Sequence, residues 1–269
     1  MSIQVGLTEL HSEPTEPRPA PPGRAEPTRF YAYLLDADDE LAEEFDVRTR
    51  IVARQATTVR VLVAQVGECD LWPAFDAVGA GAGLLILDGL IARETCVAGR
   101  TAAELVGSGD LLQPPVSHPE ELLVAEHVWH VLWPTRLALL DYDFGRRVSS
   151  WPQVMSALLR RFSRRVTDVD AMRAITSHPR LELRLVLLFW HLAGRWGRVE
   201  PGGIHLMLPL THRLLGLLLA AERPSISHAL ARLSQAGLVT GSAGDIHLHG
   251  TRSSQLASLL EHTTVELCG

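Results

Sequence analysis

Residues 208–239 read LPLTHRLLGLLLAAERPSISHALARLSQAGLV, and the spacing of their apolar residues predicts two short helices separated by a break. Thr211 can cap the first helix, which runs to about Leu219, because a threonine hydroxyl accepts a hydrogen bond from a backbone N–H. Pro224 fits the first turn of the second helix, which ends at Ala236-Gly237. This arrangement is the outline of a helix-turn-helix.

A candidate hairpin lies on each side of the two helices. Before them, residues 199–208 contain the turn sequence Pro201-Gly202-Gly203 between apolar residues. After them, residues 238–249 bend at a pair of glycines, which accept the positive φ of tight turns. Helices and hairpins together predict a winged helix-turn-helix domain over residues 177–269.

The polar face of the second helix, about residues 224–236, carries small and basic side chains. Such groups near the start of a recognition helix suit major-groove reading, because first-turn side chains reach base edges while hydroxyls and backbone amides hold phosphates. The candidate residues on this face are Arg223, Ser225, Ser227, His228 and Arg232. For Arg223 the structural alternative is an ion pair with Glu222, and for His228 it is plain solvent exposure.

The net charge of −6 is unevenly distributed along the chain. Residues 1–143 contain 10 Arg and 23 acidic residues, a charge of −13, whereas residues 144–269 contain 15 Arg and 8 acidic residues, a charge of +7. The basic half could meet phosphates, and the acidic half fits a sensing or protein-facing role. A merely solvated basic surface is the alternative.

Two longer helices are expected before the first hairpin. Ser149, Ser150 and Pro152 predict a helix start, with a serine cap and proline in the first turn. We assign residues 144–176 to this long helix, whose apolar stripe is Met155, Leu158, Phe162, Val169 and Met172. The stripe suits either packing against its own domain or a parallel dimer contact. Residues 181–196 are apolar nearly all round, which predicts a core helix ended by Gly194 and Gly197.

The amino-terminal half predicts a disordered tail followed by a β-rich domain. Residues 1–29 contain six prolines, a composition that favours disorder, and residues 36–56 predict one or two short helices. Short strands joined by turns at Asp88-Gly89 and at Ala98-Gly99-Arg100 follow. The expected strands are 57–66, 83–89, 90–97, 101–107, 127–132 and 135–140. A small antiparallel roll over residues 30–143 is the simplest architecture, so the fold class is α+β.

The sequence resembles the Crp/Fnr family of regulators. The resemblance rests on WHLAGRWGRV (190–199), on the stretch 208–239 and, more weakly, on GLLILDGLIARETCVAGRTAAELVGSGDLL (83–112). It covers nearly everything after the first 30 residues. It implies a cyclic-nucleotide-binding-like β-roll, a long dimerisation helix and a winged helix-turn-helix.

The resemblance also implies roles for individual residues. Thr211 is expected to touch phosphate, Arg223 and His228 to occupy base-reading positions, and the remaining candidates to contact the backbone or base edges. Pro224 stands where many relatives have a glutamate that reads cytosine. Because proline offers no acceptor, the usual family target sequence is not expected.

No small-molecule or metal cofactor is predicted. Relatives that bind cyclic AMP hold its phosphate with a glycine-glutamate pair and a later arginine. The stretch after Gly109-Asp110 contains no such pair, and its first arginine is Arg136. We therefore expect no dependence on cyclic AMP, and the residues of any ligand site remain unknown. A haem role is disfavoured because strand alternation would put His127 and His130 on opposite faces.

Metal and catalytic groupings are also weak. Cys69, Cys96 and Cys268 are too dispersed for a cluster, and His247 and His249 alone make a poor metal site. No catalytic motif is present, so an enzyme is not predicted.

The sequence therefore predicts a cytoplasmic, homodimeric transcription regulator that binds double-stranded DNA at a pseudo-palindromic operator. RNA polymerase is a further candidate partner, and no membrane association is expected. The alternative is a protein-binding module of the same fold that acts through polymerase or another regulator.

Overall fold

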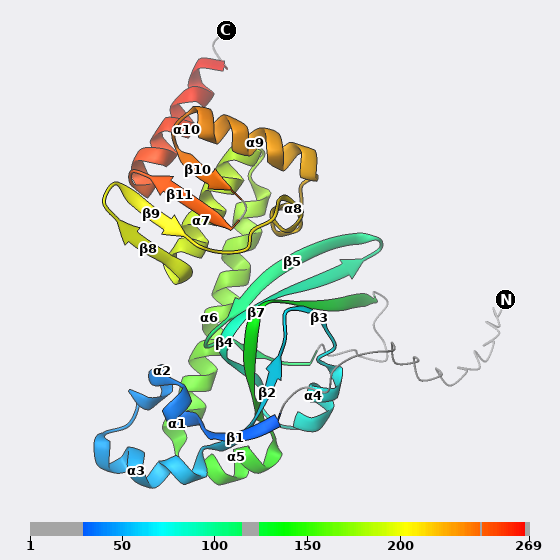
Figure 1. Cartoon of the computed structure of the whole chain (residues 1–269), viewed down its shortest axis with the longest axis vertical. Coiled ribbons are helices and arrows are strands. Elements are labelled where there is room, and N and C mark those ends of the chain that lie inside the picture. The colour runs from blue at the N-terminus through cyan, green and yellow to red at the C-terminus, as the bar shows by residue number, and fades with distance from the viewer. Residues whose placement is uncertain (1–28, 115–123, 243, 267–269) are drawn as a thin grey trace, which may run out of the picture.

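The computed structural model describes residues 29–114, 124–242 and 244–266. The predicted tail therefore lies outside the described residues except for Arg29, which begins the first strand. Figure 1 shows a β-rich lower domain, a long helix along it, and a helical upper domain. The α+β fold class is confirmed.

The lower domain is a β-roll built on one antiparallel sheet with the order β1-β2-β7-β4-β5, to which β3 and β6 add short pairings. Its strands are β1 (Arg29–Tyr33), β2 (Thr58–Ala64), β3 (Gly67–Cys69), β4 (Gly83–Val97), β5 (Arg100–Gly107), β6 (Leu111–Leu112) and β7 (Ala125–Leu140). Five short helices accompany them: α1 (Leu34–Ala37), α2 (Asp39–Ala42), α3 (Val47–Ala56), α4 (Trp72–Val78) and α5 (Tyr142–Val148).

The prediction of four short strands in the centre of the sheet is wrong. Asp88-Gly89 is not a turn, because β4 continues through it, and the pairing with β7 is irregular between Ile86 and Ile91. Gly89 has a φ of +103°, and a Cβ there would lie 2.6 Å from Cα of Thr135. Pro134 lies at the same irregularity, where a missing N–H costs no ladder hydrogen bond. Gly89 and Pro134 therefore form part of a β-bulge between two long strands.

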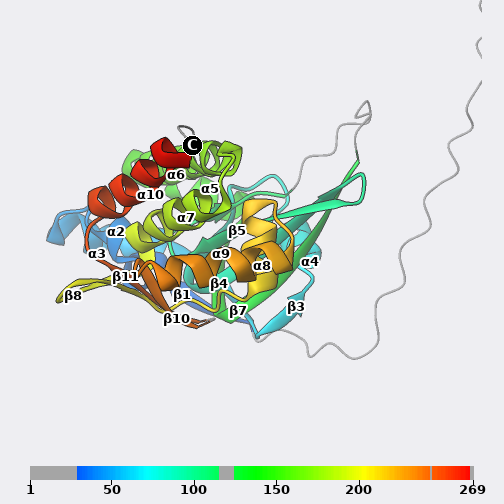
Figure 2. The same cartoon turned by 90° about the horizontal axis from the view of Figure 1, so that it is seen from above.

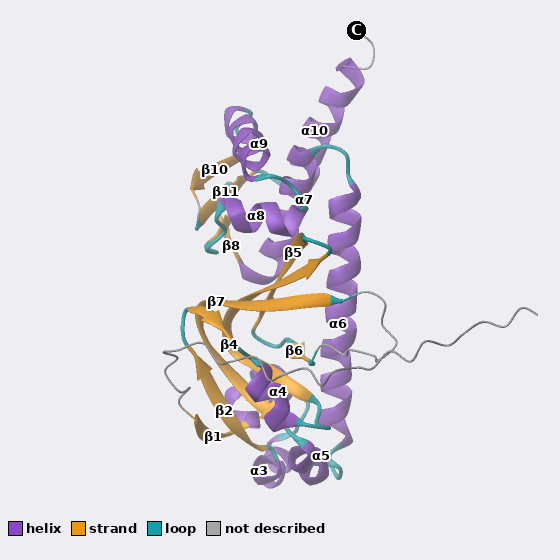
Figure 3. Ribbon diagram, turned by 90° about the vertical axis from the view of Figure 1, so that its right-hand side faces the viewer, coloured by secondary structure: helices purple, strands orange, loops and turns teal. Residues whose placement is uncertain are grey.

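Helix α6 (Pro152–Ser177) runs beside the whole β-roll and leads into the upper domain (Figure 3). It begins at Pro152, where the sequence signals placed a helix start, but the assignment of the whole segment 144–176 to it is wrong, because residues 144–148 belong to α5. Its N-cap is Trp151, and no side chain caps it. The Ser149 hydroxyl instead donates to the carbonyl of Arg146 at the end of α5, so the predicted serine cap is wrong.

A buried ion pair fastens α6 to the β-roll. Nη1 and Nη2 of Arg161 donate to the two carboxylate oxygens of Asp38 at 2.5 and 2.6 Å. Burial opposes the charge of Arg161, yet the hydrogen bonds with Asp38 raise its pKa overall. Leu158, on the same side of the helix, is also buried.

Another side of α6 exposes a separate apolar seam. Its members are between 42% and 60% exposed and follow a four-three spacing: Met155, Leu159, Phe162, Val166 and Val169. The predicted stripe mixed this seam with the packed face, because Leu158 is buried and Met172 packs against the core of the upper domain.

The upper domain has the predicted winged arrangement. Helix α7 (Leu181–Trp196) passes through Gly194 and ends only at Gly197, so the expected stop at Gly194 is wrong. Its other elements are β8 (Gly197–Glu200), β9 (Gly203–Leu206), α8 (His212–Leu219), α9 (Arg223–Gln235), β10 (Val239–Ser242), β11 (Asp245–His249) and α10 (Arg252–Glu266). The two hairpins form one antiparallel sheet with the order β10-β11-β9-β8. Across the described residues, no helix is long and apolar enough to span a bilayer.

Candidate DNA-binding site

Helices α8 and α9 meet at a tight turn. Ala220 adopts the left-handed conformation with a φ of +50°, and the N–H of Ala221 donates to the carbonyl of Gly216 at 2.9 Å. A Cβ on Gly216 would lie 2.5 Å from the carbonyl oxygen of Ala221. The glycine in α8 therefore permits the close approach that sets the two helices of the motif against each other.

Helix α9 has one buried and one exposed face. Ile226, Ala229 and Leu233 are at most 1% exposed and join the core of the upper domain. Seen from above, α9 lies between α7 and the strands of the wing (Figure 2). This packing fixes the direction in which the opposite face points.

The first two turns of α9 present unengaged polar groups to solvent. Arg223, Pro224, Ser225 and His228 are all exposed. Within the described ranges, the side chains of Arg223 and His228 have neither a hydrogen bond nor an ion pair, so the alternative of an Arg223–Glu222 pair is not observed. These two cationic or dipolar groups are available to an external ligand.

The other three candidate residues are engaged within the domain. The Thr211 hydroxyl accepts a hydrogen bond from the N–H of Leu214 at 3.1 Å, which confirms its capping role, and its side chain is exposed. Oγ of Ser227 lies 2.8 Å from Nδ1 of His212 and 3.1 Å from the carbonyl oxygen of Arg223. Arg232 forms an ion pair with Glu182 on α7. Ser227 and Arg232 thus support the motif internally.

Sequence reasoning missed a contact between the helix-turn-helix and the β-roll. Nη1 and Nη2 of Arg213 on α8 donate to the two carboxylate oxygens of Glu94 on β4, at 2.7 and 2.9 Å. The hydrogen bond with Glu94 raises the pKa of Arg213. Figure 1 shows α8 directly above β5, with which it is in contact. No local pattern could show this pairing, because 119 residues separate its partners.

The predicted separation of His127 and His130 is borne out by their partners on β4. Nδ1 of His127 lies 3.1 Å from Oγ1 of Thr95, whereas Nε2 of His130 lies 3.4 Å from the carboxylate of Glu94. Thr95 and Glu94 are neighbours on a strand, so the two histidines point to opposite faces of the sheet. Burial lowers the pKa of His127, and the nearby charge of Arg93 lowers it further.

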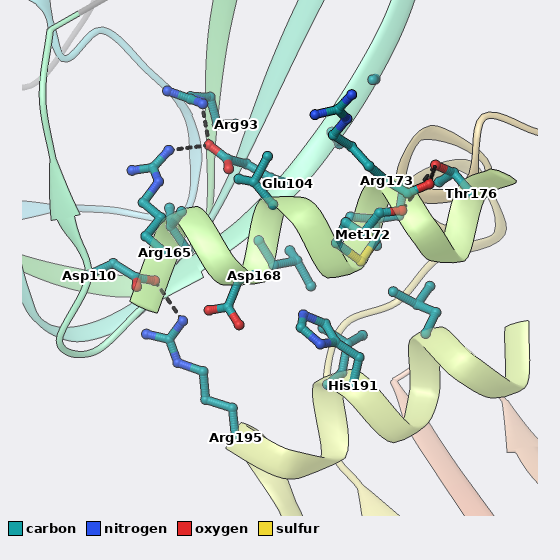
Figure 4. Close-up of a pocket in the computed structure, with 18 of the residues that line it drawn as sticks. Arg93, Glu104, Asp110, Arg165, Asp168, Met172, Arg173, Thr176, His191 and Arg195 are labelled. Atoms are coloured by element: carbon teal, nitrogen blue, oxygen red, sulfur yellow. Dashed lines mark hydrogen bonds and ion pairs between the residues drawn. The ribbon is translucent and has the colours of Figure 1, made fainter. Parts of the chain in front are cut away.

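A cavity of about 330 Å³ lies between the β4–β5 hairpin, α6 and α7 (Figure 4). Three of its four arginines have close carboxylate partners, since Arg93 and Arg165 converge on Glu104 and Nη1 of Arg195 lies 2.8 Å from Asp110. The exposed Arg173 lies 3.7 Å from Asp170. The cavity is assembled from segments distant in sequence, so the sequence offered no candidate lining residues.

Comparison with known proteins agrees with this architecture. Residues 183–252 match the family model described as a Crp-like helix-turn-helix domain. The search of curated proteins found no match.

Three solved structures illustrate the likeness of the whole fold. A cyclic nucleotide-binding domain containing protein from Listeria monocytogenes has 16% identity and a TM-score of 0.57, over 70% of this chain and 88% of that one. The c-di-GMP responsive global regulator CLP from Xanthomonas campestris has 16% identity and a TM-score of 0.55, over 80% and 100%. FixK2 from Bradyrhizobium japonicum has 15% identity and a TM-score of 0.54, over 72% and 93%. The predicted Crp/Fnr-type architecture is confirmed.

Proposed function

We propose that this chain, which carries a Crp-like helix-turn-helix domain on the fold of Crp/Fnr-type regulators, is a transcription regulator that reads DNA as a homodimer. The observation that carries the proposal is the first two turns of α9, where Arg223 and His228 are exposed and unengaged on a helix whose other face is buried. A rigid helix with free donors at its start suits the major groove. The role needs no catalytic step.

Arg223 and His228 take the base-reading positions in this proposal. A guanidinium donates to O6 and N7 of guanine, and an imidazole can donate to or accept from a base edge. Thr211 and the backbone amides at the start of α8 hold phosphate, as helix N-termini do. Pro224 adds no hydrogen bond, so half-sites with the family's usual cytosine contact are not preferred.

The exposed seam of α6 supports the homodimer. Alternating spacings of four and three residues from Met155 to Val169 form a heptad stripe, and such a stripe buries itself against an identical helix. Two-fold pairing of α6 would place two copies of α9 on one side of the dimer. Their half-sites are then expected about 34 Å apart, one turn of DNA.

Dependence on cyclic AMP is not part of the proposal. A cyclic phosphate needs an available cation and amide donors. In the cavity beside α6, Arg93, Arg165 and Arg195 are already paired with carboxylates. The sequence 115–123, in which relatives place part of the phosphate-binding segment, lies outside the described residues.

Selection of bound sequences from random DNA tests the proposal with the purified full chain and no added ligand. The expected result is enrichment of a pseudo-palindrome whose half-sites are one helical turn apart. Enrichment of a single half-site would contradict the dimer. Absence of retardation even at low salt, together with capture of RNA polymerase, would favour the protein-binding alternative and contradict direct reading.

A further inference from the structure

Two histidines stack on the outer face of the wing sheet. His205 on β9 and His247 on β11 are directly paired across the strands, and their ring centroids lie 4.1 Å apart with an angle of 9° between the planes. Strand alternation directs both rings away from the core, since the neighbouring Leu206, Ile246 and Leu248 are buried. The rings are therefore not needed to fill the interior.

Two carboxylates bracket the rings at opposite ends. Oε1 of Glu200 lies 3.3 Å from Nδ1 of His205, and Oε2 lies 3.9 Å from Nδ1 of His247. Oδ1 of Asp245 lies 2.5 Å from Nε2 of His205 and 3.3 Å from Nε2 of His247. All four ring nitrogens thus face carboxylate oxygens, and we call these four residues the wing histidine cluster.

Neutral histidines cannot satisfy this arrangement alone. Each neutral imidazole has one N–H donor and one nitrogen lone pair, so only two of the four nitrogens can donate to a carboxylate. The other two would point lone pairs at anionic oxygens. Protonating both rings would instead stack two positive charges 4.1 Å apart. A cation held between the nitrogens and one carboxylate removes the conflict.

We propose that Glu200, His205 and His247 bind one divalent transition-metal ion, with Zn²⁺ the leading candidate, and that Asp245 orients both rings by accepting from their Nε2–H groups. One ligand atom from each of the three residues lies within 4.8 Å of the others. Ligands about 2.1 Å from a tetrahedral ion lie about 3.4 Å apart. The 3.3 and 3.9 Å separations on the Glu200 side, each to a different carboxylate oxygen, are close to that spacing, and the two stacked rings must turn toward each other to aim both Nδ1 lone pairs at one ion. The 2.5 and 3.3 Å separations on the Asp245 side suit hydrogen bonds.

The ligand chemistry favours a borderline metal over Mg²⁺ or Ca²⁺. Two imidazoles and one carboxylate suit Zn²⁺, Ni²⁺ or Co²⁺, whereas Mg²⁺ and Ca²⁺ prefer oxygen ligands. A carboxylate that accepts from the second ring nitrogen is a recurrent support for a metal-bound histidine. The neighbouring Arg198, paired with His205 on β8, carries a positive charge that opposes a cation at this face.

The site would tie together two segments of the wing domain. Glu200 ends β8, whereas His247 lies on β11, so a bound ion would link the first hairpin to the wing hairpin. Three protein ligands leave an open position, which is typical of exchangeable sites rather than closed structural ones. The proposal does not rest on DNA binding.

Calorimetric titration of the chelator-treated full chain with Zn²⁺ tests the site. The expected result is one high-affinity ion per chain, whose affinity falls at least tenfold in Glu200→Gln and His247→Gln. Asp245→Asn should weaken it about 10- to 100-fold, because the carboxylate that accepts from the second nitrogen of each metal-bound ring is lost. His249→Gln is the matched control, because His249 follows on the same strand but lies 2.7 Å from Oγ1 of Thr240 instead. Circular dichroism checks that each variant is folded.

A second readout separates this site from other histidines. Co²⁺ should give the visible absorption bands of a low-coordinate N/O site in the wild type and in His249→Gln, and these bands should be lost in Glu200→Gln. Absence of high-affinity Zn²⁺ binding, or binding that Glu200→Gln and His247→Gln leave unchanged, would overturn the proposal.

Discussion

The first turn of α9 and the cavity beside α6 both contain arginine, but the arginines are used differently. On α9, Arg223 is exposed and has no partner among the described side chains. In the cavity, Arg93 and Arg165 share Glu104, and Arg195 is paired with Asp110. An unpaired cation on a rigid surface can neutralise an external phosphate or reach a base, whereas a paired one holds its own chain together.

The contrast also concerns stability. A solvent-exposed arginine contributes little to the free energy of folding, so the residue at that position is free to be determined by ligand binding. A buried arginine must keep its carboxylate, because an uncompensated charge in the interior is costly. The molecule thus contains an exposed arginine that is free to contact an external ligand and buried arginines that hold parts of the chain together.

The largest effect is expected when a fastening cation loses its partner. Asp38→Ala removes the two hydrogen bonds to the buried guanidinium of Arg161 and leaves it with the weaker attraction of Glu40 and Asp110, so we expect the free energy of unfolding to fall by about 3–5 kcal/mol. Arg223→Ala should change it by less than about 0.5 kcal/mol. Urea denaturation of the two variants measures both values. Equal losses would break the distinction between the two kinds of arginine.

The seam of α6 is expected to give the next largest effect, on association rather than folding. Burying one phenylalanine contributes about 1.5–3 kcal/mol per chain, so Phe162→Glu should weaken the dimer by about a hundredfold or more. Ser163→Glu adds the same charge one residue off the seam and should leave association unchanged. Sedimentation equilibrium compares them. An unchanged dimer dissociation constant in Phe162→Glu would show that the dimer interface lies elsewhere.

The contact between the two domains should give a smaller effect. Arg213 is largely exposed, so Arg213→Ala is expected to cost about 1 kcal/mol or less in unfolding free energy. The loss should be confined to the contact between α8 and the β-roll, because the substitution removes only the ion pair that Arg213 makes with Glu94. Hydrogen exchange is therefore expected to rise in β5 and to stay constant in β2. A uniform rise across the β-roll would show that this ion pair fastens the whole domain.

The smallest effect is expected from pH. The pKa of His127 is lowered by burial, so the unfolded chain takes up the proton first as the pH falls. Its contribution to stability is therefore full above the unfolded pKa of about 6.5 and is lost as the pH falls toward the folded value. His127→Gln should flatten the stability profile in this window. An unchanged profile would mean that His127 is not desolvated enough to matter.

The helix-turn-helix could be predicted from sequence because its signals are local. Thr211 caps α8, Pro224 sits in the first turn of α9, and glycines mark the wing turns, each within a few residues of the effect. The long strands could not be recovered in the same way. Gly89 and Pro134 look like chain reversals, and only their mutual contact across β4 and β7 makes them a bulge.

Contacts between distant segments limited the candidate site in the same way. The stripe on α6 contained residues of two faces, and only packing separates Leu158 from Leu159. The sequence places only His249 close to His247, because His205 lies 42 positions away and is brought to His247 by strand pairing. Periodicity gives the faces of an element, but not which other element covers them.

The most direct test of the central claim is the base preference of Arg223→Ala on the DNA selected by the wild type. If the exposed cation reads a base, binding should weaken by about 1–3 kcal/mol and specificity should relax at one position in each half-site. Arg146→Ala removes an exposed arginine from α5, at the opposite end of the molecule, and should leave both unchanged. Wild-type affinity and base preference in Arg223→Ala would contradict the assignment of α9 as the reading helix.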